Sequence, residues 1–433
     1  MENKFNINMA RYIIAAGEFI QGYDTSIVGV ALLFMNNEFH FDAYHTGLLI
    51  GVTDLGGIIG LLGCGYLADR FGRKAVFNIN LIVFTIFAII SGFAQDFTQI
   101  FITRFILGIA IGADIPVICS FLGEIAPANK RGRFVAFTPQ FFQILGVISA
   151  SALGLFFRDG GNDVWRWLFI AGAVPAIIIF MARRHLPESP VWLAKAGRMK
   201  EAEDACKQLG IKFDVQSISQ KPTRLKELLT PKFMIPMSAI YLFGILHCML
   251  SPISSKATPY ILRYGMGSSV TTSFELTILI QVGAIIGMYI GSTALDLTNR
   301  KKAGSVGLLL TGVLYLLVAF VGIPSHSMII MGGLYFLLML CYWTFIPTMA
   351  YVWSTELFPV RLRATANGIQ FSSCRVGSVI GSNLIIMGMA TIGLEKTIAL
   401  ATLPVLGMWI ILMTVNSLHK NQGKELNSIE QEL

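Results

Sequence analysis

Two charged residues lie inside long apolar segments of the chain. Asp24 falls within GEFIQGYDTSIVGVALLF, residues 17–34, and Arg104 falls within FITRFILGIAIG. A charged side chain at the centre of a bilayer costs about 2.5–3.5 kcal/mol on insertion scales, and two opposite charges that face each other would offset that cost. Protonation of Asp24 would break such a pair and deprotonation would restore it, so the pair could couple a proton to a conformational change. The alternative is a static ion pair that holds two helices in register.

A second embedded cation, Arg375, lies within the apolar segment RATANGIQFSSCRVGSVIGSNL. A guanidinium in this position needs an anion, which could be the internal acid Asp54 or Glu275, or a carboxylate or phosphate of a substrate. We predict that Arg375 contacts substrate, with a structural or gating pair as the alternative. His247 and Lys256 could add positive character to the same cavity. We expect Lys256 near the outer end of its segment, where its side chain would snorkel.

Three further acids lie in apolar segments, and their roles stay open at this point. Asp114 lies about 15 Å along its helix from the embedded arginine, so it is not an obvious partner for that residue. It could be a second proton site, a substrate contact or part of a solvated wall. Glu18 and Asp24 differ by about 240° around their helix and do not share a face. Glu18 could simply reach water, and Asp54 has the same ambiguity as Asp114.

Polar and aromatic residues in other apolar segments are further candidates for contact with a small solute. Gln281 and Asn383 could bind substrate or could form hydrogen bonds between helices. Trp343 precedes Pro347 in the aromatic-rich segment YFLLMLCYWTFIPTMAYVW. Because proline interrupts helical hydrogen bonding and favours a bend, this segment predicts an aromatic cavity wall that moves. For Tyr351 and Trp353, the alternative is a position that faces lipid or the membrane interface.

The composition places these residues in a membrane protein. Of the 433 residues, 54% are hydrophobic and 13% are charged, whereas soluble domains carry about 25% charged residues. A helical span needs about 20 apolar residues, and the first apolar run is long enough to remain as a span rather than a cleaved signal peptide. The predicted fold is an all-α membrane protein with twelve transmembrane helices, near residues 12–34, 46–67, 75–93, 99–121, 134–156, 165–183, 233–255, 272–294, 303–322, 328–352, 365–388 and 394–416.

The distribution of basic residues gives the predicted orientation. With both termini in the cytoplasm, most of the 33 Lys and Arg residues fall in cytoplasmic segments, as the positive-inside rule requires. The net charge of +8 therefore reflects topology, and a nucleic-acid partner is not expected. The predicted units are a first six-helix bundle, a cytoplasmic linker, a second six-helix bundle and a cytoplasmic tail, at residues 1–183, 184–232, 233–416 and 417–433.

Two loop motifs recur in the two halves of the chain. GYLADRFGRK (65–74) has a counterpart in STALDLTNRKK (292–302), and GEIAPANKRGR (123–133) has one in TELFPVRLRA (355–364). The offset is about 230 residues in both cases, which indicates a parallel repeat of two bundles. Carboxylates and arginines that face each other across the bundles would form a cytoplasmic latch; surface charge that only sets topology is the alternative. The predicted latch residues are Asp69, Arg70, Arg73, Glu124, Arg133, Glu356 and Arg363.

These motifs resemble the major facilitator superfamily over essentially the whole chain. The segment PESPVWLAKAGRMKEAE (187–203) resembles the loop after the sixth helix in the branch that contains sugar porters, organic-ion transporters and aromatic-acid/proton symporters. The resemblance implies alternating access, in which two bundles rock about a central site. It also implies that Asp24 in GYDTSIVGVAL and Arg104 in TRFILGIAIG form the proton-coupling pair. The seventh helix lacks the Gln pair of sugar porters, the tail lacks their P-E-T-K-G run, and the eleventh helix resembles that of the organic-ion and aromatic-acid branch.

The sequence therefore predicts a secondary transporter that carries a small polar metabolite, an organic anion, together with protons. A sugar or polyol symporter and a proton-driven efflux antiporter are the alternatives. The residues show no P-loop, nucleophile motif or metal-ligand spacing, so we expect neither an enzyme nor a cofactor or metal. The six Cys are expected to be free thiols. Short loops without an N-x-[ST] acceptor favour a bacterial inner membrane, and the expected partners are the solute, protons and lipid, with the protein a monomer.

Overall fold

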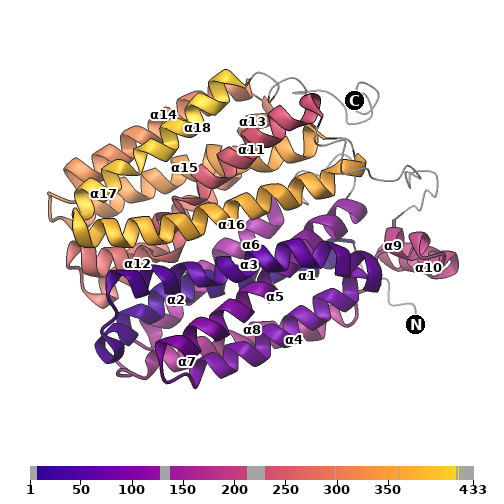
Figure 1. Cartoon of the computed structure of the whole chain (residues 1–433), viewed down its shortest axis with the longest axis horizontal. Helices are drawn as coiled ribbons and strands as arrows, with labels where there is room; N and C mark the ends of the chain where they lie inside the picture. The colour runs from indigo at the N-terminus through magenta and orange to yellow at the C-terminus, as the bar shows by residue number, and fades with distance from the viewer. Residues whose placement is uncertain are drawn as a thin grey trace.

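The computed structural model describes residues 7–126, 137–211, 230–297, 299–358, 360–415 and 418. Every element in these ranges is helical, and the helices form two bundles that lie side by side (Figure 1). The indigo-to-magenta helices of the first half form one bundle, and the rose-to-yellow helices of the second half form the other. The two bundles meet along α3 and α16, which pack against each other over much of their length.

The first bundle contains six hydrophobic segments, two of which are interrupted. Its helices are α1 Ile7–Ala15, α2 Gly17–Phe39, α3 Ala43–Phe71, α4 Arg73–Gly92, α5 Phe97–Ile125, α6 Thr138–Phe156, α7 Val164–Ala171 and α8 Ala173–Arg183. Aspartates begin two of the long helices. Asp42 accepts a hydrogen bond from His45 N at the start of α3, and Asp96 accepts one from Gln99 N at the start of α5, which satisfies backbone donors that the helix itself leaves free.

The second bundle repeats this arrangement with more irregular segments. Its elements are α11 Pro231–Cys248, η5 Pro252–Lys256, α12 Thr258–Tyr260, η6 Ile261–Gly265, α13 Val270–Leu297, α14 Arg300–Leu317, η7 Val318–Gly322, α15 Met328–Glu356, α16 Val360–Thr391, α17 Leu394–Leu400 and α18 Thr402–Thr414. The segment from α11 to η6 contains two π-helical stretches. Such stretches rotate the side chains that follow them relative to a regular helix.

Two short helices, α9 Pro190–Lys195 and α10 Met199–Leu209, lie outside the bundles at one end of the molecule (Figure 1). Their apolar residues pack against each other, with Leu193 and Ala194 of α9 against Ala202 and Ala205 of α10. Gly210 ends α10 with a φ of 67°, a conformation that glycine adopts without strain. The end of the molecule that carries α9 and α10 is called the linker end below.

Eleven of the described helical segments are long and apolar enough to cross a membrane. The first predicted span, 12–34, is not among them, although it forms α1 and α2 inside the bundle. Almost every residue of α2 from Gly17 to Met35 is buried. Because α2 is surrounded by protein rather than lipid, it can carry polar residues that a lipid-facing helix would not tolerate.

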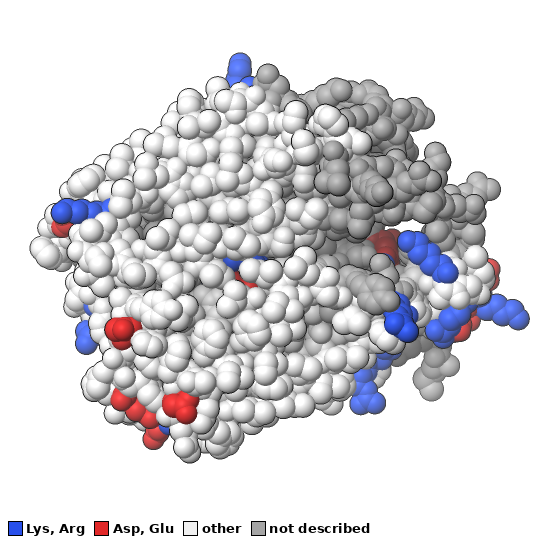
Figure 2. All heavy atoms as spheres, viewed as in Figure 1, with Lys and Arg blue, Asp and Glu red and all other residues white. Residues whose placement is uncertain are grey.

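The surface has the pattern of a protein that sits in a bilayer. Charged residues gather at the two ends of the face in Figure 2, and the region between them is largely uncharged. Large apolar side chains such as Leu62 and Ile329 are strongly exposed. Exposed apolar area of this kind is expected where the outside of a bundle contacts lipid.

Glycines bring the two bundles into close contact at the end opposite the linker end. A Cβ placed on Gly29 of α2 would lie 2.0 Å from the carbonyl oxygen of Lys256, and one on Gly154 of α6 would lie 2.9 Å from the Phe274 ring. Gly47 and Gly51 of α3 pack on the α16 backbone near Ser382. Small residues allow such close approach between helices, so these contacts hold the bundles together at this end.

Candidate functional site

A cavity of about 1020 Å³, counting space that is open to solvent, lies between the two bundles. Its lining comes from α2, α3, α5 and α6 of the first bundle and from α11, η5, α13, α15 and α16 of the second. The polar lining includes five glutamines, five hydroxyl residues and four charged residues. These are Gln21, Gln140, Gln143, Gln281 and Gln370; Thr25, Ser251, Ser254, Ser255 and Ser378; and Glu18, Asp54, Lys256 and Arg375.

A carboxylate of the first bundle binds two cations of the second bundle inside this cavity. Arg375 Nη1 of α16 donates a hydrogen bond to Asp54 Oδ1 at 2.6 Å, and Lys256 Nζ of η5 donates to Asp54 Oδ2. Ser378 Oγ also donates to Asp54 Oδ2, at 2.6 Å. Asp54 is 0% exposed. Both of its oxygens are therefore occupied by donors, as a fully buried carboxylate requires.

The positions of the three charged residues of this cluster were only partly predicted. Arg375 does bind an internal acid, and it is Asp54 rather than Glu275. The prediction that Lys256 snorkels at the outer end of its segment was wrong, because Lys256 is buried and faces the cavity. The physical reason is the π-helical segment η5, which follows the end of α11 at Cys248 and turns Lys256 inward.

Asp24 and Arg104 form the buried ion pair that the sequence predicted. Arg104 Nη1 of α5 donates to Asp24 Oδ1 of α2 at 2.5 Å, and the two side chains are 1% and 2% exposed. The guanidinium also lies 3.7 Å from the centre of the Phe169 ring of α7, which adds a cation–π contact. Neither residue is part of the cavity lining. The pair lies inside the first bundle, and its role in proton coupling stays a prediction.

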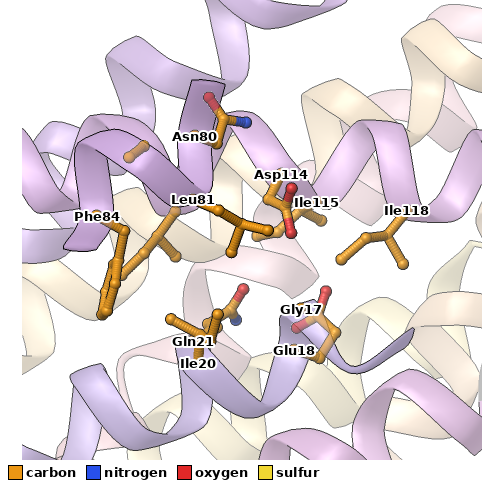
Figure 3. A pocket seen from close by; sticks show the side chains of 12 residues that line it. Gly17, Glu18, Ile20, Gln21, Asn80, Leu81, Phe84, Asp114, Ile115 and Ile118 are labelled. Atoms are coloured by element: carbon orange, nitrogen blue, oxygen red, sulfur yellow. The ribbon is translucent and has the colours of Figure 1, made fainter. Parts of the chain in front are cut away.

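A second cavity lies within the first bundle between α2, α4 and α5 (Figure 3). Its empty volume is about 300 Å³, again counting open space, and its lining includes Glu18 and Asp114. In Figure 3 both carboxyl groups point into the space between α2 and α5. Glu18 lines this cavity and the central cavity. It is 7% exposed, so it borders cavity space rather than the outer surface of the bundle.

Asp114 has a cation partner, Arg183 at the end of the first bundle, that the sequence did not pair with it. Both terminal nitrogens of Arg183 donate to the Asp114 carboxylate, at 3.0–3.2 Å. Arg183 Nη2 also donates to the carbonyl oxygen of Ile14 at 2.9 Å. The structure therefore places Asp114 in an ion pair beside the smaller cavity and not in the central cavity. The pairing was missed because Asp114 and Arg183 lie on different helices, α5 and α8, 69 residues apart in the chain.

The remaining predicted substrate contacts divide into two groups. Trp343 and Gln281 line the central cavity, and Gln281 Nε2 donates to the carbonyl oxygen of Ser254 at 2.7 Å. Asn383 does not line the cavity, and its amide donates to the carbonyl oxygen of Val379. Because Asn383 lies two turns further along α16 than Arg375, it reaches the close contact with Gly47 of α3 instead.

Two of the described latch residues, Arg73 and Glu124, form a network with the linker at one bundle. Arg73 Nη2 at the start of α4 lies 3.3 Å from Glu124 Oε1 of α5, and Ser189 Oγ donates to the other oxygen of Glu124. Glu188 accepts hydrogen bonds from Arg73 N and Lys74 N, so it caps the N-terminus of α4. The segment PESP thus docks α9 on the first bundle.

The contact across the two bundles that the latch requires stays a prediction. Arg70 is described and exposed, and its guanidinium carbon lies 5.4 Å from the centre of the Phe71 ring. Arg133 and the side chains of Asp69, Glu356 and Arg363 lie outside the described part of the chain.

Cavity residues that sequence reasoning missed include four glutamines and two cysteines. Each glutamine stands in an apolar segment, where a polar side chain is costly, and that signal could have identified Gln21, Gln140, Gln143 and Gln370. His247, Cys248 and Cys374 also line the cavity, and their ligand atoms lie within 4.8 Å of one another. Local spacing cannot reveal this group because Cys374 comes from another helix. The five described Cys are free, as predicted.

Comparison with known proteins gives a consistent result along the chain. The family model described as "Sugar (and other) transporter" matches residues 10–432. The arabinose-proton symporter of Bacillus subtilis (strain 168) is 28% identical over 375 residues, which are 82% of this chain and 79% of that protein. The D-xylose transporter of Levilactobacillus brevis is 26% identical over 385 residues, which are 84% of this chain and 82% of that protein.

A solved structure has the same fold. The xylose transporter XylE from E. coli, in a partially occluded inward open conformation, matches with a TM-score of 0.81 and 19% identity. The match covers 95% of this chain and 98% of the other. The fold is therefore that of the major facilitator superfamily.

Proposed function

Because the chain belongs to the sugar (and other) transporter family, we propose that it is a proton-coupled symporter of a small polar metabolite. It is a multi-pass membrane transporter and not an enzyme. In the proposal, the two bundles rock about the central cavity, with residues 1–183 and 233–416 as the moving units. The membrane is a bacterial inner membrane with both termini in the cytoplasm, and the unit is a monomer.

The observation that carries the coupling proposal is the buried pair of Asp24 and Arg104. A proton on Asp24 removes the charge that holds Arg104 Nη1 at 2.5 Å, and the guanidinium must then find another partner or water. Because the pair joins α2 to α5, its breakage changes how these two helices pack. The arrangement thus gives a physical link between protonation and the shape of the first bundle.

The first candidate for the solute is an organic anion. Two cations of the second bundle, Lys256 and Arg375, lie in the cavity lining and bind the single carboxylate of Asp54. A guanidinium and an ammonium that converge on one carboxylate can also bind a carboxylate from solution. The predicted roles of Trp343 and Gln281 fit the same cavity, where they would contact the rest of the solute.

The second candidate is a neutral sugar or polyol. The five glutamine amides of the lining each offer donors and an acceptor, as a hydroxylated solute requires. The names of the relatives, an arabinose-proton symporter and a D-xylose transporter, favour this class. Efflux by proton antiport uses the same acid and differs only in the direction of coupling.

Uptake into proteoliposomes with an imposed inward proton gradient tests the proposed function. The panel pairs sugars and polyols with carboxylates. Gradient-stimulated uptake of a carboxylate supports the anion candidate, and stimulation of a sugar or polyol supports the second candidate. Loss of preloaded solute under the same gradient would indicate antiport, and no effect of the gradient on any solute would contradict proton coupling.

A further inference from the structure

We propose that the substrate is a sugar acid, a polyhydroxylated carboxylate whose anionic group replaces Asp54 on Lys256 and Arg375. The proposal rests on the transport function proposed above and names the substrate class of the same cavity. It combines two features of the lining, a clamp for one carboxylate and a set of buried amides.

The clamp already holds a carboxylate, which is that of Asp54. Arg375 Nη1 binds one oxygen at 2.6 Å, and Lys256 Nζ and Ser378 Oγ bind the other. Lys256 Nζ also donates to Ser378 Oγ at 2.6 Å, which holds the donors together. A substrate carboxylate has the same charge and the same pair of acceptor oxygens, so it can take the place of Asp54.

The donors and the resident acceptor belong to different bundles. Lys256 and Arg375 are both carried by the second bundle, whereas Asp54 is on α3 of the first. When the bundles separate, the two cations stay together and lose their only carboxylate among the described residues. Buried cations without an anion are unfavourable. A substrate carboxylate would neutralise them at that stage, so its binding favours the separation of Asp54 that the transport cycle requires.

The rest of the cavity suits hydroxyl groups rather than apolar surface. Gln21, Gln140, Gln281 and Gln370 are each 9% exposed or less and come from four different helices around the cavity. The Oε1 atoms of Gln21 and Gln281 have no hydrogen-bond partner in the described part of the chain. A buried acceptor of this kind is satisfied by a hydroxyl donor of a ligand. Hydroxyls and amides can each donate and accept, so several such pairs can form at once.

A simpler solute satisfies only one of these two features. A neutral sugar leaves Asp54 in the clamp, and a short aliphatic carboxylate leaves the glutamine acceptors unpaired. Glu18 is the other acid among the described residues of the lining, and in its charged form it would repel a substrate anion. Entry of a proton with the substrate can remove that repulsion, so the charges of the cavity favour symport of the acid with a proton.

Binding to the purified full-length protein, measured by isothermal titration calorimetry, tests this assignment. The probes are matched pairs with one carbon skeleton: D-glucuronate with D-glucose, and D-gluconate with D-sorbitol. We expect at least one acid to bind at least tenfold more tightly than its neutral partner. Arg375→Gln should raise the Kd of that acid at least tenfold, Arg375→Lys should restore part of the affinity, and Lys200→Gln in the exposed helix α10 should have no effect.

The Asp54→Asn variant distinguishes the proposal from a general loss of folding, because the proposal predicts a gain in affinity for the acid. Without the resident carboxylate, the acid should bind more tightly while the affinity for the neutral partner stays the same. The proposal is overturned if no acid binds, if neutral partners bind as tightly as the acids, or if Asp54→Asn weakens both equally. Proton-driven uptake of a neutral sugar would sink this inference and leave the symport function intact. Tight, Arg375-dependent binding of an acid without proton-driven uptake would support this inference and contradict the symport function.

Discussion

Asp54 of α3 and Arg375 of α16 are joined by an ion pair of 2.6 Å that crosses from the first bundle to the second. Both side chains line the central cavity, and Asp54 is fully buried. In the proposed transport cycle, the pair therefore lies where the solute passes and where the two bundles separate. The pair is thus a contact between the bundles, and in our proposal Asp54 competes with an anionic solute for Arg375.

Replacement of Asp24 by Asn should abolish proton-driven accumulation and leave solute exchange intact. Asn keeps a hydrogen-bond acceptor for Arg104 but cannot gain or lose the proton. A gradient of one pH unit supplies about 1.4 kcal/mol, or about tenfold accumulation for symport with one proton. We expect the wild type to approach that value and Asp24→Asn to stop at equilibrium. Asp163→Asn, at an exposed acid outside the bundle core, serves as the control, and full accumulation by Asp24→Asn would refute the coupling role.

Replacement of Gly29 by Ala should disfavour the conformation described here. A Cβ at this position would come within 2.0 Å of the Lys256 carbonyl oxygen, so α2 and η5 would have to move apart. We expect the distance between spin labels on the two bundles at the end opposite the linker end to increase, with slower transport. Gly333→Ala in α15 is the matched control, because a Cβ there meets no atom within 4 Å. Equal distance distributions for both variants would contradict the assigned role of this contact.

Replacement of Asp114 by Asn should destabilise the protein more than it alters solute affinity. The change leaves the buried Arg183 without its carboxylate, and loss of one partner of a buried ion pair costs about 3–5 kcal/mol. We expect a clear fall in the Tm measured in detergent, with a KM within about twofold of the wild type. Asp204→Asn removes an exposed pair with Lys207 and should change the Tm little. A large rise in KM with an unchanged Tm would contradict this prediction and indicate that Asp114 contacts substrate.

Replacement of Ser189 by Ala should loosen the attachment of α9 to the first bundle. Ser189 Oγ accepts from Trp192 N at the start of α9 and donates to Glu124, and loss of a helix N-cap alone costs about 1 kcal/mol. We expect faster cleavage by trypsin at Lys195 and Arg198 in native protein. Ser149→Ala removes a hydroxyl that only donates within its own helix and is the control. Unchanged cleavage rates would contradict this prediction and show that Glu188 and the apolar contacts suffice to hold α9 on the first bundle.

The sequence predicted the features that depend on local composition and on paired embedded charges. Hydropathy identified the membrane segments, and the cost of an isolated charge in lipid correctly joined Asp24 to Arg104. The same reasoning proposed Asp54 as a partner for Arg375. It could not choose between Asp54 and Glu275, because that choice depends on which faces of α3, α13 and α16 turn inward.

Features that depend on helix irregularity or on packing between distant segments could not be predicted. The position of Lys256 follows from the π-helical segment η5, which has no distinct sequence signal. Arg183 is the last residue of the sixth predicted span, and only tertiary packing shows that it is buried beside Asp114. The position of Glu18 could not be predicted either, because only the packing of α2 inside the bundle places it between two cavities.

Solute-driven proton movement tests the central claim, proton-coupled symport, most directly. Proteoliposomes with a pH-sensitive dye in the lumen and no initial gradient would receive the solute found in the uptake panel. Symport predicts that the lumen becomes more acidic as the solute enters, and that Asp24→Asn takes up the solute without this change. Entry of the solute into wild-type vesicles with no pH change, or with a rise in luminal pH, would contradict the account.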